Sequence, residues 1–184
     1  DKKIAYFIKN KKLEYIEHYI DEDPSILKRP LTHNAEGNTV YHEALKHNSK
    51  HILLYLFKNA DRDIINRTNT KGETLLHMAM GIDNPNIIVD CMKFGSDINA
   101  LNTQNESPIY NAIRAGLYNN VLSSINNNAD LYLKNKDGET PLVVACFTKN
   151  KQIGIVRLLV NNGSDINNLT KDKKTILQSI LEKE

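Results

Sequence analysis

The sequence contains few cysteines, no tryptophan and no long apolar run. Its two cysteines, Cys91 and Cys146, both lie at apolar positions of expected helices and are more than one repeat apart. Unpaired cysteines are typical of a reducing compartment, so we expect an intracellular, cytoplasmic protein, of the producing cell or of a host cell. No run of 18 apolar residues is present, and we therefore expect no membrane insertion.

Neither sign of charge dominates. The 184 residues include 24 lysines and arginines and 22 aspartates and glutamates, which gives a formal net charge of +2. This balance does not favour a nucleic acid or a membrane surface as the partner. A lysine cluster near the N-terminus contains no arginine, so we expect no nucleic-acid partner.

No group of residues has the spacing of a catalytic or metal site. Three residues separate Glu43 from His47, so the stretch from His42 to His51 does not match the zinc-protease pattern His-Glu-x-x-His. Neither His42 nor His77 has a serine, cysteine or aspartate at a suggestive spacing, and no glycine-rich phosphate loop is present. We therefore expect no catalytic residue, no metal and no cofactor.

One phrase returns along the chain at nearly constant spacing. Its copies are Thr39–Ala44, Thr74–Ala79, Ser107–Ala112, Thr140–Ala145 and the weaker Thr175–Ser179, at steps of 35, 33, 33 and 35 residues. A fixed period of this size predicts a stacked array of structural repeats. Such arrays generally present extended binding surfaces, which favours recognition over chemistry.

The second repeat indicates the structure of one unit. Gly72 permits a sharp turn, and Thr74 is suited to cap the N-terminus of a short helix. A second helix begins near Asn86 and ends at Gly95, which can adopt the left-handed conformation of a helix stop. We expect the same N-cap role for the residue that opens each of the other four copies. An extended finger-like loop then leads to the next unit.

These residues resemble the ankyrin-repeat family, over roughly residues 34–180. The resemblance implies an all-α solenoid of stacked helix-turn-helix repeats with β-hairpin-like finger loops. A single domain is expected, with a degenerate N-terminal capping repeat at 1–33, ankyrin repeats at 34–68, 69–101, 102–134 and 135–169, and a partial repeat at 170–184.

The sequence departs from the family pattern at a few positions. Tyr110 and Val143 replace the motif histidine, which in the family bonds locally and stiffens the fingers. Asn105 and Lys173 replace the turn glycine. Two residues are gained near residues 62–65 of the first finger, and two near residues 148–152, between the helices of the fourth repeat.

In the family, ligands lie along the concave face formed by the finger tips and the first helices. The corresponding positions here are Glu36, Asn38, Lys46, His47, Lys71, Glu73, Ile82, Gln104, Glu106, Arg114, Lys136, Asp137, Glu139, Phe147 and Thr148. Ile82, Arg114 and Phe147 are of the residue types that anchor interfaces. The alternative for Phe147 is an inward orientation against the nearby insertion. The resemblance also makes Asn99 and Asn167 candidates for asparaginyl hydroxylation.

The leading hypothesis is a non-enzymatic module that binds another protein and is monomeric by itself. Lysine outnumbers arginine by 19 to 5 and asparagine occurs 24 times, which fits an AT-rich genome. This composition suggests an effector or host-interaction factor of an intracellular pathogen or symbiont. The alternative is a targeting or autoinhibitory segment of a larger enzyme or channel, and the absence of an initiator Met leaves it open.

Overall fold

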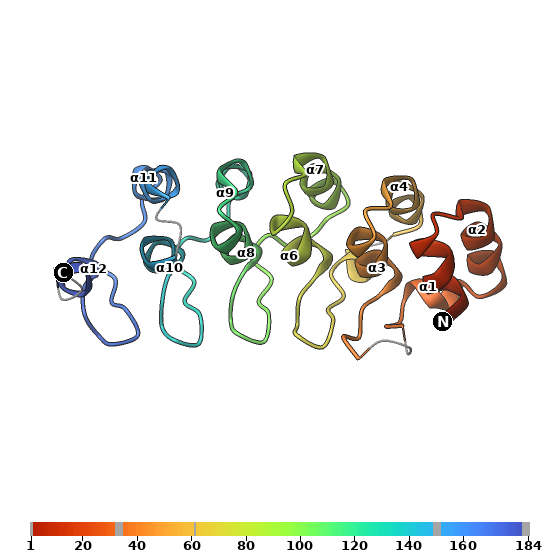
Figure 1. Cartoon of the computed structure of the whole chain (residues 1–184), viewed down its shortest axis with the longest axis horizontal. Helices are drawn as coiled ribbons and strands as arrows, with labels where there is room; N and C mark the ends of the chain where they lie inside the picture. The colour runs from red at the N-terminus through yellow and green to blue at the C-terminus, as the bar shows by residue number, and fades with distance from the viewer. Residues whose placement is uncertain (1, 32–34, 61, 149–151, 182–184) are drawn as a thin grey trace.

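The helices of this chain are arranged in a row of pairs. The structure is a computed structural model that describes residues 2–31, 35–60, 62–148 and 152–181. Figure 1 shows the pairs side by side from the N-terminal to the C-terminal end, with the loops before the first helices projecting to one side as fingers. The described ranges contain no β-strand, and a single β-bridge joins Leu169 to Thr175. The predicted all-α solenoid is thus confirmed.

Each central repeat contributes a first and a second helix. The pairs are α3 with α4, α6 with α7, α8 with α9, and α10 with α11. Their bounds, with those of the other helices, are α1 Lys2–Lys9, α2 Leu13–Glu22, η1 Pro24–Leu27, α3 Val40–Lys46, α4 Lys50–Lys58, α5 Arg62–Ile65, α6 Leu75–Met80, α7 Pro85–Lys93, α8 Pro108–Ala115, α9 Tyr118–Asn126, α10 Pro141–Phe147, α11 Ile153–Asn161 and α12 Ile176–Leu181.

The residues expected at the helix starts have the backbone conformation of N-caps. Thr39, Thr74, Ser107 and Thr140 are extended and directly precede α3, α6, α8 and α10. Thr175 precedes α12, and its Oγ1 accepts a hydrogen bond of 3.2 Å from the backbone N–H of Gln178. The periodic phrase therefore predicted the helix starts correctly.

The two substitutions at the turn glycine keep the glycine conformation. Asn105 has a φ of 56° and Lys173 a φ of 59°, close to the 71° of Gly72. Asparagine tolerates this left-handed region better than most residues, whereas lysine has to be held there by its surroundings. Asn128 adopts a φ of 61° at a helix stop, as Gly95 does at 86°. The expected turns and stops are therefore present.

The core is shared between neighbouring repeats. First helices pack on first helices along the row, as α3 does on α6 and α6 on α8, and second helices pack likewise, as α7 does on α9. On α6, Leu75, Leu76 and Met80 are fully buried among these neighbours. Burying one such side chain contributes about 1.5–3 kcal/mol, so a repeat without neighbours would lose much of its stability.

The chain ends and the two insertions complete the row. Ile4 and Ile8 of α1 and Ile16 and Ile20 of α2 are buried, as expected for an N-terminal repeat that covers one end of the core.

The insertion in the first finger forms α5, whose last two residues are buried. The insertion expected at residues 148–152 falls largely on residues 149–151, outside the described ranges. The repeat boundaries given above stay a prediction.

Candidate functional site

An asparagine side chain shapes each of the three central fingers. Asn69 Oδ1 accepts hydrogen bonds from the backbone N–H groups of Lys71 and Glu73, at 2.9 and 3.0 Å. Asn102 and Asn135 repeat this pattern 33 and 66 residues later, with distances of 2.8 to 3.0 Å. Two backbone donors bound to one oxygen hold the turn in a single shape, so the finger tips have a defined geometry.

Backbone hydrogen bonds connect each finger to the next. The backbone N–H and the hydroxyl of Thr70 both donate to Glu36 O at 2.9 Å. Thr103 makes the same two bonds to Lys71 O, and Lys136 N donates to Gln104 O at 2.9 Å. The tips therefore form one connected edge.

A second row of contacts joins the first helices to the following fingers. His42 Nδ1 accepts a hydrogen bond of 3.2 Å from the backbone N–H of Thr39, its N-cap. The ring proton must then lie on Nε2, which donates to Glu73 O at 3.0 Å in the next finger. His77 makes the same contacts with its own N-cap and with Glu106 O. The local hydrogen bonds expected of these histidines are therefore present, and each also reaches the next finger.

Tyr110 continues this row, but Val143 does not. The Tyr110 hydroxyl lies 2.7 Å from both Glu139 O and Leu133 O, so its one proton is shared between two carbonyl groups. Val143 has no polar atom to offer at the next position, and the buried hydroxyl of its N-cap Thr140 has no hydrogen-bond partner. The contact between finger and helix is therefore made by a different group at Tyr110 and is absent at Val143.

Burial shifts the pKa values of the two histidines His42 and His77 and of the two cysteines. It lowers the pKa of His42 from 6.5 to about 4, against a smaller opposing effect of the bond to Glu73, and it also lowers the pKa of His77. Burial raises the pKa of the Cys91 thiol to about 12 and raises the pKa of Cys146. The two histidines are thus neutral at pH 7 and the two thiols are protonated, which suits structural roles.

Neither a metal site nor a membrane-spanning helix is found in the part of the chain that the structure describes. Across the described ranges, no three His, Cys, Asp or Glu side chains form a group that could hold a metal ion. No helix in the same part of the chain is long and apolar enough to cross a bilayer.

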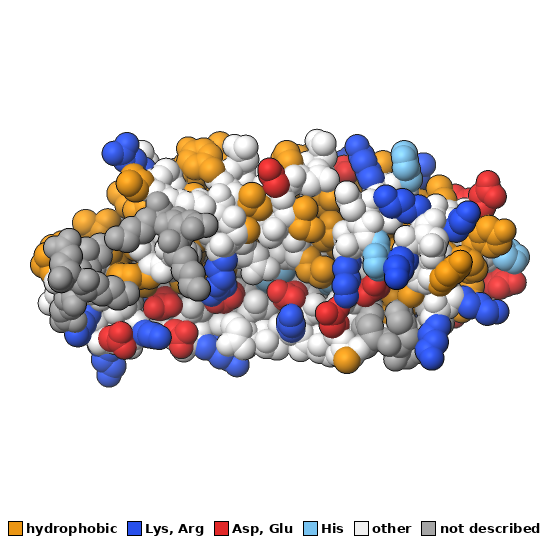
Figure 2. All heavy atoms as spheres, viewed as in Figure 1, with side chains coloured by type: hydrophobic (Ala, Val, Ile, Leu, Met, Phe, Trp, Pro, Cys, Tyr) orange, Lys and Arg blue, Asp and Glu red, His pale blue; other side chains and the backbone are white. Residues whose placement is uncertain are grey.

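The structure distributes the predicted partner-binding residues over three environments. The exposed residues are Glu36, Lys46, Lys71, Ile82, Gln104, Arg114, Lys136 and Asp137. The half-buried residues are His47, Glu73, Glu139, Phe147 and Thr148. The buried residues are Asn38 and Glu106. Figure 2 shows acidic and basic side chains close together along the lower part of the displayed face, over the fingers and first helices. The half-buried state of Phe147 lies between the two orientations considered for it.

Asn38 and Glu106 are the two predicted partner-binding residues that the structure buries. The Asn38 Nδ2 group donates to Glu36 Oε2 at 2.8 Å and to Glu43 Oε1 at 3.0 Å. Glu106 is enclosed because the guanidinium of Arg114 covers its carboxylate. Both side chains therefore lie beneath the surface of the fingers and first helices, where Asn38 bonds to exposed Glu36 and Glu106 bonds to exposed Arg114.

Arg114 and Glu106 form a bidentate ion pair. Arg114 Nη1 donates to Glu106 Oε2 at 2.6 Å, and Nη2 donates to Oε1. The Glu106 side chain is 9% exposed and that of Arg114 is 45% exposed, so the pair is partly shielded from water. The hydrogen bond to Glu106 raises the pKa of Arg114. The arginine expected to anchor a partner is thus already bound to a carboxylate of its own chain.

Loop asparagines connect the repeats on the side of the second helices. Asn99 Oδ1 accepts from Asp130 N at 2.8 Å, and its Nδ2 contacts Asn128 O at 3.4 Å. Asn66 makes the equivalent pair of contacts one repeat earlier. Asn167 is exposed at the corresponding loop near the C-terminal end. Hydroxylation of Asn99 or Asn167 stays a prediction.

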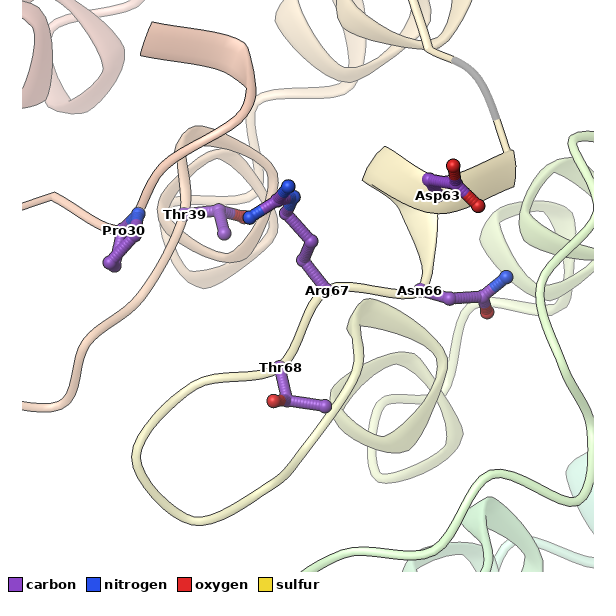
Figure 3. A pocket seen from close by; sticks show the side chains of 6 residues that line it. All are labelled: Pro30, Thr39, Asp63, Asn66, Arg67 and Thr68. Atoms are coloured by element: carbon purple, nitrogen blue, oxygen red, sulfur yellow. The ribbon is translucent and has the colours of Figure 1, made fainter. Parts of the chain in front are cut away.

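A polar pocket of about 340 Å³ lies beside α5, lined by Pro30, Thr39, Asp63, Asn66, Arg67 and Thr68. In Figure 3 the Arg67 side chain points toward Thr39, whereas Asp63 points away from it. Thr39 already contacts His42, and Asn66 already bonds to Gly95 O and Asp97 N. This pocket could not be predicted from the sequence, because it depends on how the inserted residues fold.

Two exposed apolar residues were also not predicted from the sequence. Tyr118 and Ile153 stand at the first positions of α9 and α11 and are 45% and 65% exposed. The sequence shows that both residues are apolar, but an apolar residue in a repeat is ordinarily assigned to the hydrophobic core. Their position at a helix start, before the regular apolar pattern begins, is the signal that would have found them.

Comparisons with known proteins agree with this geometry. A family model described as ankyrin repeats (3 copies) matches residues 109–183. The nuclear factor NF-kappa-B p105 subunit of Rattus norvegicus is 24% identical over 149 residues. The match covers 77% of this chain and 15% of that protein, so the chain spans about a seventh of its relative.

A solved structure shows the same fold. It is the crystal structure of an ankyrin repeat domain from Acinetobacter baumannii AYE, which is 22% identical to this chain and superposes with a TM-score of 0.84. The match covers 99% of this chain and 92% of the solved one. The whole row of helix pairs, including the N-terminal repeat, therefore has a counterpart of known structure.

Proposed function

This chain is an ankyrin-repeat protein, and we propose that it is a non-enzymatic module that binds a partner protein along its finger and first-helix face. Ankyrin repeats are generally protein–protein interaction modules. The observation that carries the proposal is the connected edge of finger tips, held by bonds such as Thr70 to Glu36 O and His42 to Glu73 O. A fixed edge lowers the conformational entropy lost when a partner binds.

The exposed groups of this face suit a protein partner. The tips carry Lys71, Lys136 and Asp137, all exposed, and the ends of the first helices add Ile82 and Phe147. Mixed charges next to apolar side chains favour a specific protein surface over a simple polyanion. The proposed module acts inside a cell as a monomer, and its composition supports a role as an effector or host-interaction factor.

The partial coverage of the relative supports a second candidate function. This chain corresponds to 15% of the rat protein, which shows that such an array occurs within a much longer chain. The array would then be the targeting or autoinhibitory segment of a larger enzyme or channel. The full reading frame tests this candidate, because a catalytic or membrane region outside these residues would support it.

Affinity capture with matched variants tests the main proposal. The test variants are Lys71→Glu, Lys136→Glu and Phe147→Ala, and the control is Val89→Ser, which changes an exposed residue of α7. We expect proteins captured from lysate by the unmodified chain and by Val89→Ser to be lost with the test variants, with unchanged helical circular dichroism. Capture of the same proteins by all four variants would contradict binding on this face.

A further inference from the structure

The second and third repeats have a glutamate at the same place, directly before the N-cap of the first helix. In the third repeat this residue is Glu106, and Arg114, eight residues later, forms the bidentate ion pair with it. In the second repeat it is Glu73, and the residue eight positions later is Gly81. The second repeat therefore has the carboxylate of this pair and lacks the cation.

Within the described ranges, Glu73 forms no ion pair. Its side chain is half-buried, and its Oε2 atom accepts a hydrogen bond of 3.3 Å from the neutral amide of Asn69. Lys46, on the neighbouring helix α3, is already held 2.9 Å from Glu36 Oε2. Lys71, at the tip of the same finger, is exposed and makes no ion pair with any described residue. Glu73 is thus a partly dehydrated carboxylate without a bound counter-charge.

Gly81 leaves room for the missing side chain. It is exposed and has a φ of −84°, which residues other than glycine adopt freely. A Cβ at this position would meet only Met78 O, at the ordinary contact distance of 3.5 Å. The backbone therefore does not require glycine here, and the place from which Arg114 reaches its glutamate in the third repeat is unfilled in the second.

The fourth repeat also lacks this cation, but its glutamate lies close to Arg114. Phe147 stands eight residues after Glu139. The pKa of Arg114 is raised mainly by the hydrogen bond to Glu106, and the charge of Glu139 adds a smaller effect in the same direction. Glu139 therefore lies within electrostatic reach of an arginine of its own chain, which makes Glu73 the better place for a cation from outside.

We propose that Glu73 and the unfilled place at Gly81 form a subsite for an arginine or lysine in a basic segment of the partner protein. The cation of the partner takes toward Glu73 the place that Arg114 takes toward Glu106. A charge-assisted hydrogen bond to a half-buried carboxylate contributes to affinity and fixes the register of the bound segment. This inference rests on the proposed function, since it names the chemistry of the partner at one point of the same face.

A displayed library of random 16-residue peptides tests the chemistry of the occupant. Selection is carried out in parallel on the unmodified full chain and on its Glu73→Gln variant. We expect peptides enriched in Arg or Lys from the unmodified chain, and a clear loss of that enrichment with the variant. Peptides without basic enrichment, or the same enrichment from both chains, would overturn the proposal.

Fluorescence anisotropy with one selected peptide locates the bound cation. Glu73→Gln is expected to raise the Kd of the peptide roughly tenfold, and Gly81→Arg to do the same, because the new arginine neutralises Glu73 within the chain. Gly81→Gln fills the same place without charge and is expected to raise the Kd less than about threefold. Asp63→Asn, which removes an exposed carboxylate of α5, is the control for overall charge and should leave the Kd unchanged.

The outcomes separate this subsite from the proposed function. An unchanged Kd for Glu73→Gln would overturn the subsite, and so would equal losses for Gly81→Gln and Gly81→Arg, which would attribute the effect to bulk alone. If Phe147→Ala weakens binding and Glu73→Gln does not, the finger and first-helix face stands and the subsite fails. If none of these variants weakens binding, both proposals fail.

Discussion

The phenol oxygen of Tyr110 lies 2.7 Å from the carbonyl oxygen of Glu139, which is the contact that His42 and His77 make with Glu73 and Glu106. The side chain differs, but a donor reaches the carbonyl at the base of the next finger in all three cases. Each of these carbonyl groups also accepts a hydrogen bond of 3.0 Å from a backbone N–H of its own finger, as Glu73 O does from Asn69 N, so the side chain supplies a second donor. The function of the motif histidine is therefore to supply one positioned proton, and an imidazole is not required for it.

Removal of the Tyr110 hydroxyl is expected to destabilise the chain. Tyr110→Phe keeps the buried ring but leaves Glu139 O and Leu133 O without this donor, so we expect the free energy of unfolding to fall by about 1 kcal/mol. Tyr132→Phe is the matched control, because its hydroxyl bonds to Gly163 O at an exposed site. Urea denaturation measures both variants, and a loss for Tyr132→Phe as large as that for Tyr110→Phe would contradict the argument.

The N-cap hydroxyls are expected to contribute unequally. Thr74 Oγ1 lies 2.9 Å from His77 Nδ1 and 3.4 Å from His77 N, whereas Thr140 Oγ1 is buried without a hydrogen-bond partner. Thr74→Val should lower the free energy of unfolding by about 1 kcal/mol, and Thr140→Val by no more than a few tenths. Thermal or urea unfolding compares them, and equal losses would show that the Thr74 contacts contribute nothing beyond backbone capping.

Stability is expected to fall as the solution is acidified through the titration range of His42. Its pKa is 6.5 in an unfolded chain and about 4 in the fold, so between these values the unfolded state binds more protons. The contribution of His42 is fully present above pH 6.5 and is lost as the pH falls toward 4. The pKa difference corresponds to roughly 3 kcal/mol, and the lowered pKa of His77 acts in the same direction.

Urea unfolding at several pH values between 7.5 and 4 measures this dependence. His42→Gln should be less stable at pH 7.5 and should lose less stability on acidification than the unmodified chain. His18→Gln is the control for the loss of an imidazole, because the His18 side chain is 75% exposed. A His42→Gln variant with the same slope as the unmodified chain would exclude His42 as the titrating group.

The repeat architecture could be predicted from the sequence because it depends on local signals that recur. Thr74 as an N-cap, Gly95 as a helix stop and the turn at Asn105 each follow from the preferences of one residue within a few neighbours. Their regular spacing then specifies the stacking, since each helix pair has apolar residues that only a neighbouring pair can cover.

The burial and exposure of individual side chains on the finger and first-helix face, and at the starts of the second helices, could not be predicted in the same way. Glu106 is buried because Arg114, eight residues later on α8, folds over it, and a repeat pattern contains no information about that contact. Tyr118 and Ile153 are exposed at the first positions of α9 and α11, although both are apolar. The recurring geometry of the repeat thus follows from local residues, whereas the exposure of its surface side chains follows from long-range packing.

The Arg114–Glu106 pair is expected to stabilise the fold more than the pair of Lys46 and Glu36. Removing Arg114 leaves a carboxylate that is 9% exposed without its counter-charge, whereas the side chains of the other pair are 46% and 48% exposed. We expect Arg114→Ala to lower the free energy of unfolding by about 1–2 kcal/mol, after allowance for the exposure of Arg114 itself, and Lys46→Ala by less than about 0.5 kcal/mol.

The double variant of Arg114→Ala with Glu106→Gln distinguishes a lost attraction from an uncompensated buried charge. If the buried charge is the cause, the neutral glutamine restores part of the stability that Arg114→Ala removes. Urea denaturation of the two single variants and the double variant gives this coupling directly. Additive losses would show that the pair contributes through packing of the two side chains alone, and Arg114 would then be free to act as the partner anchor that its residue type suggests.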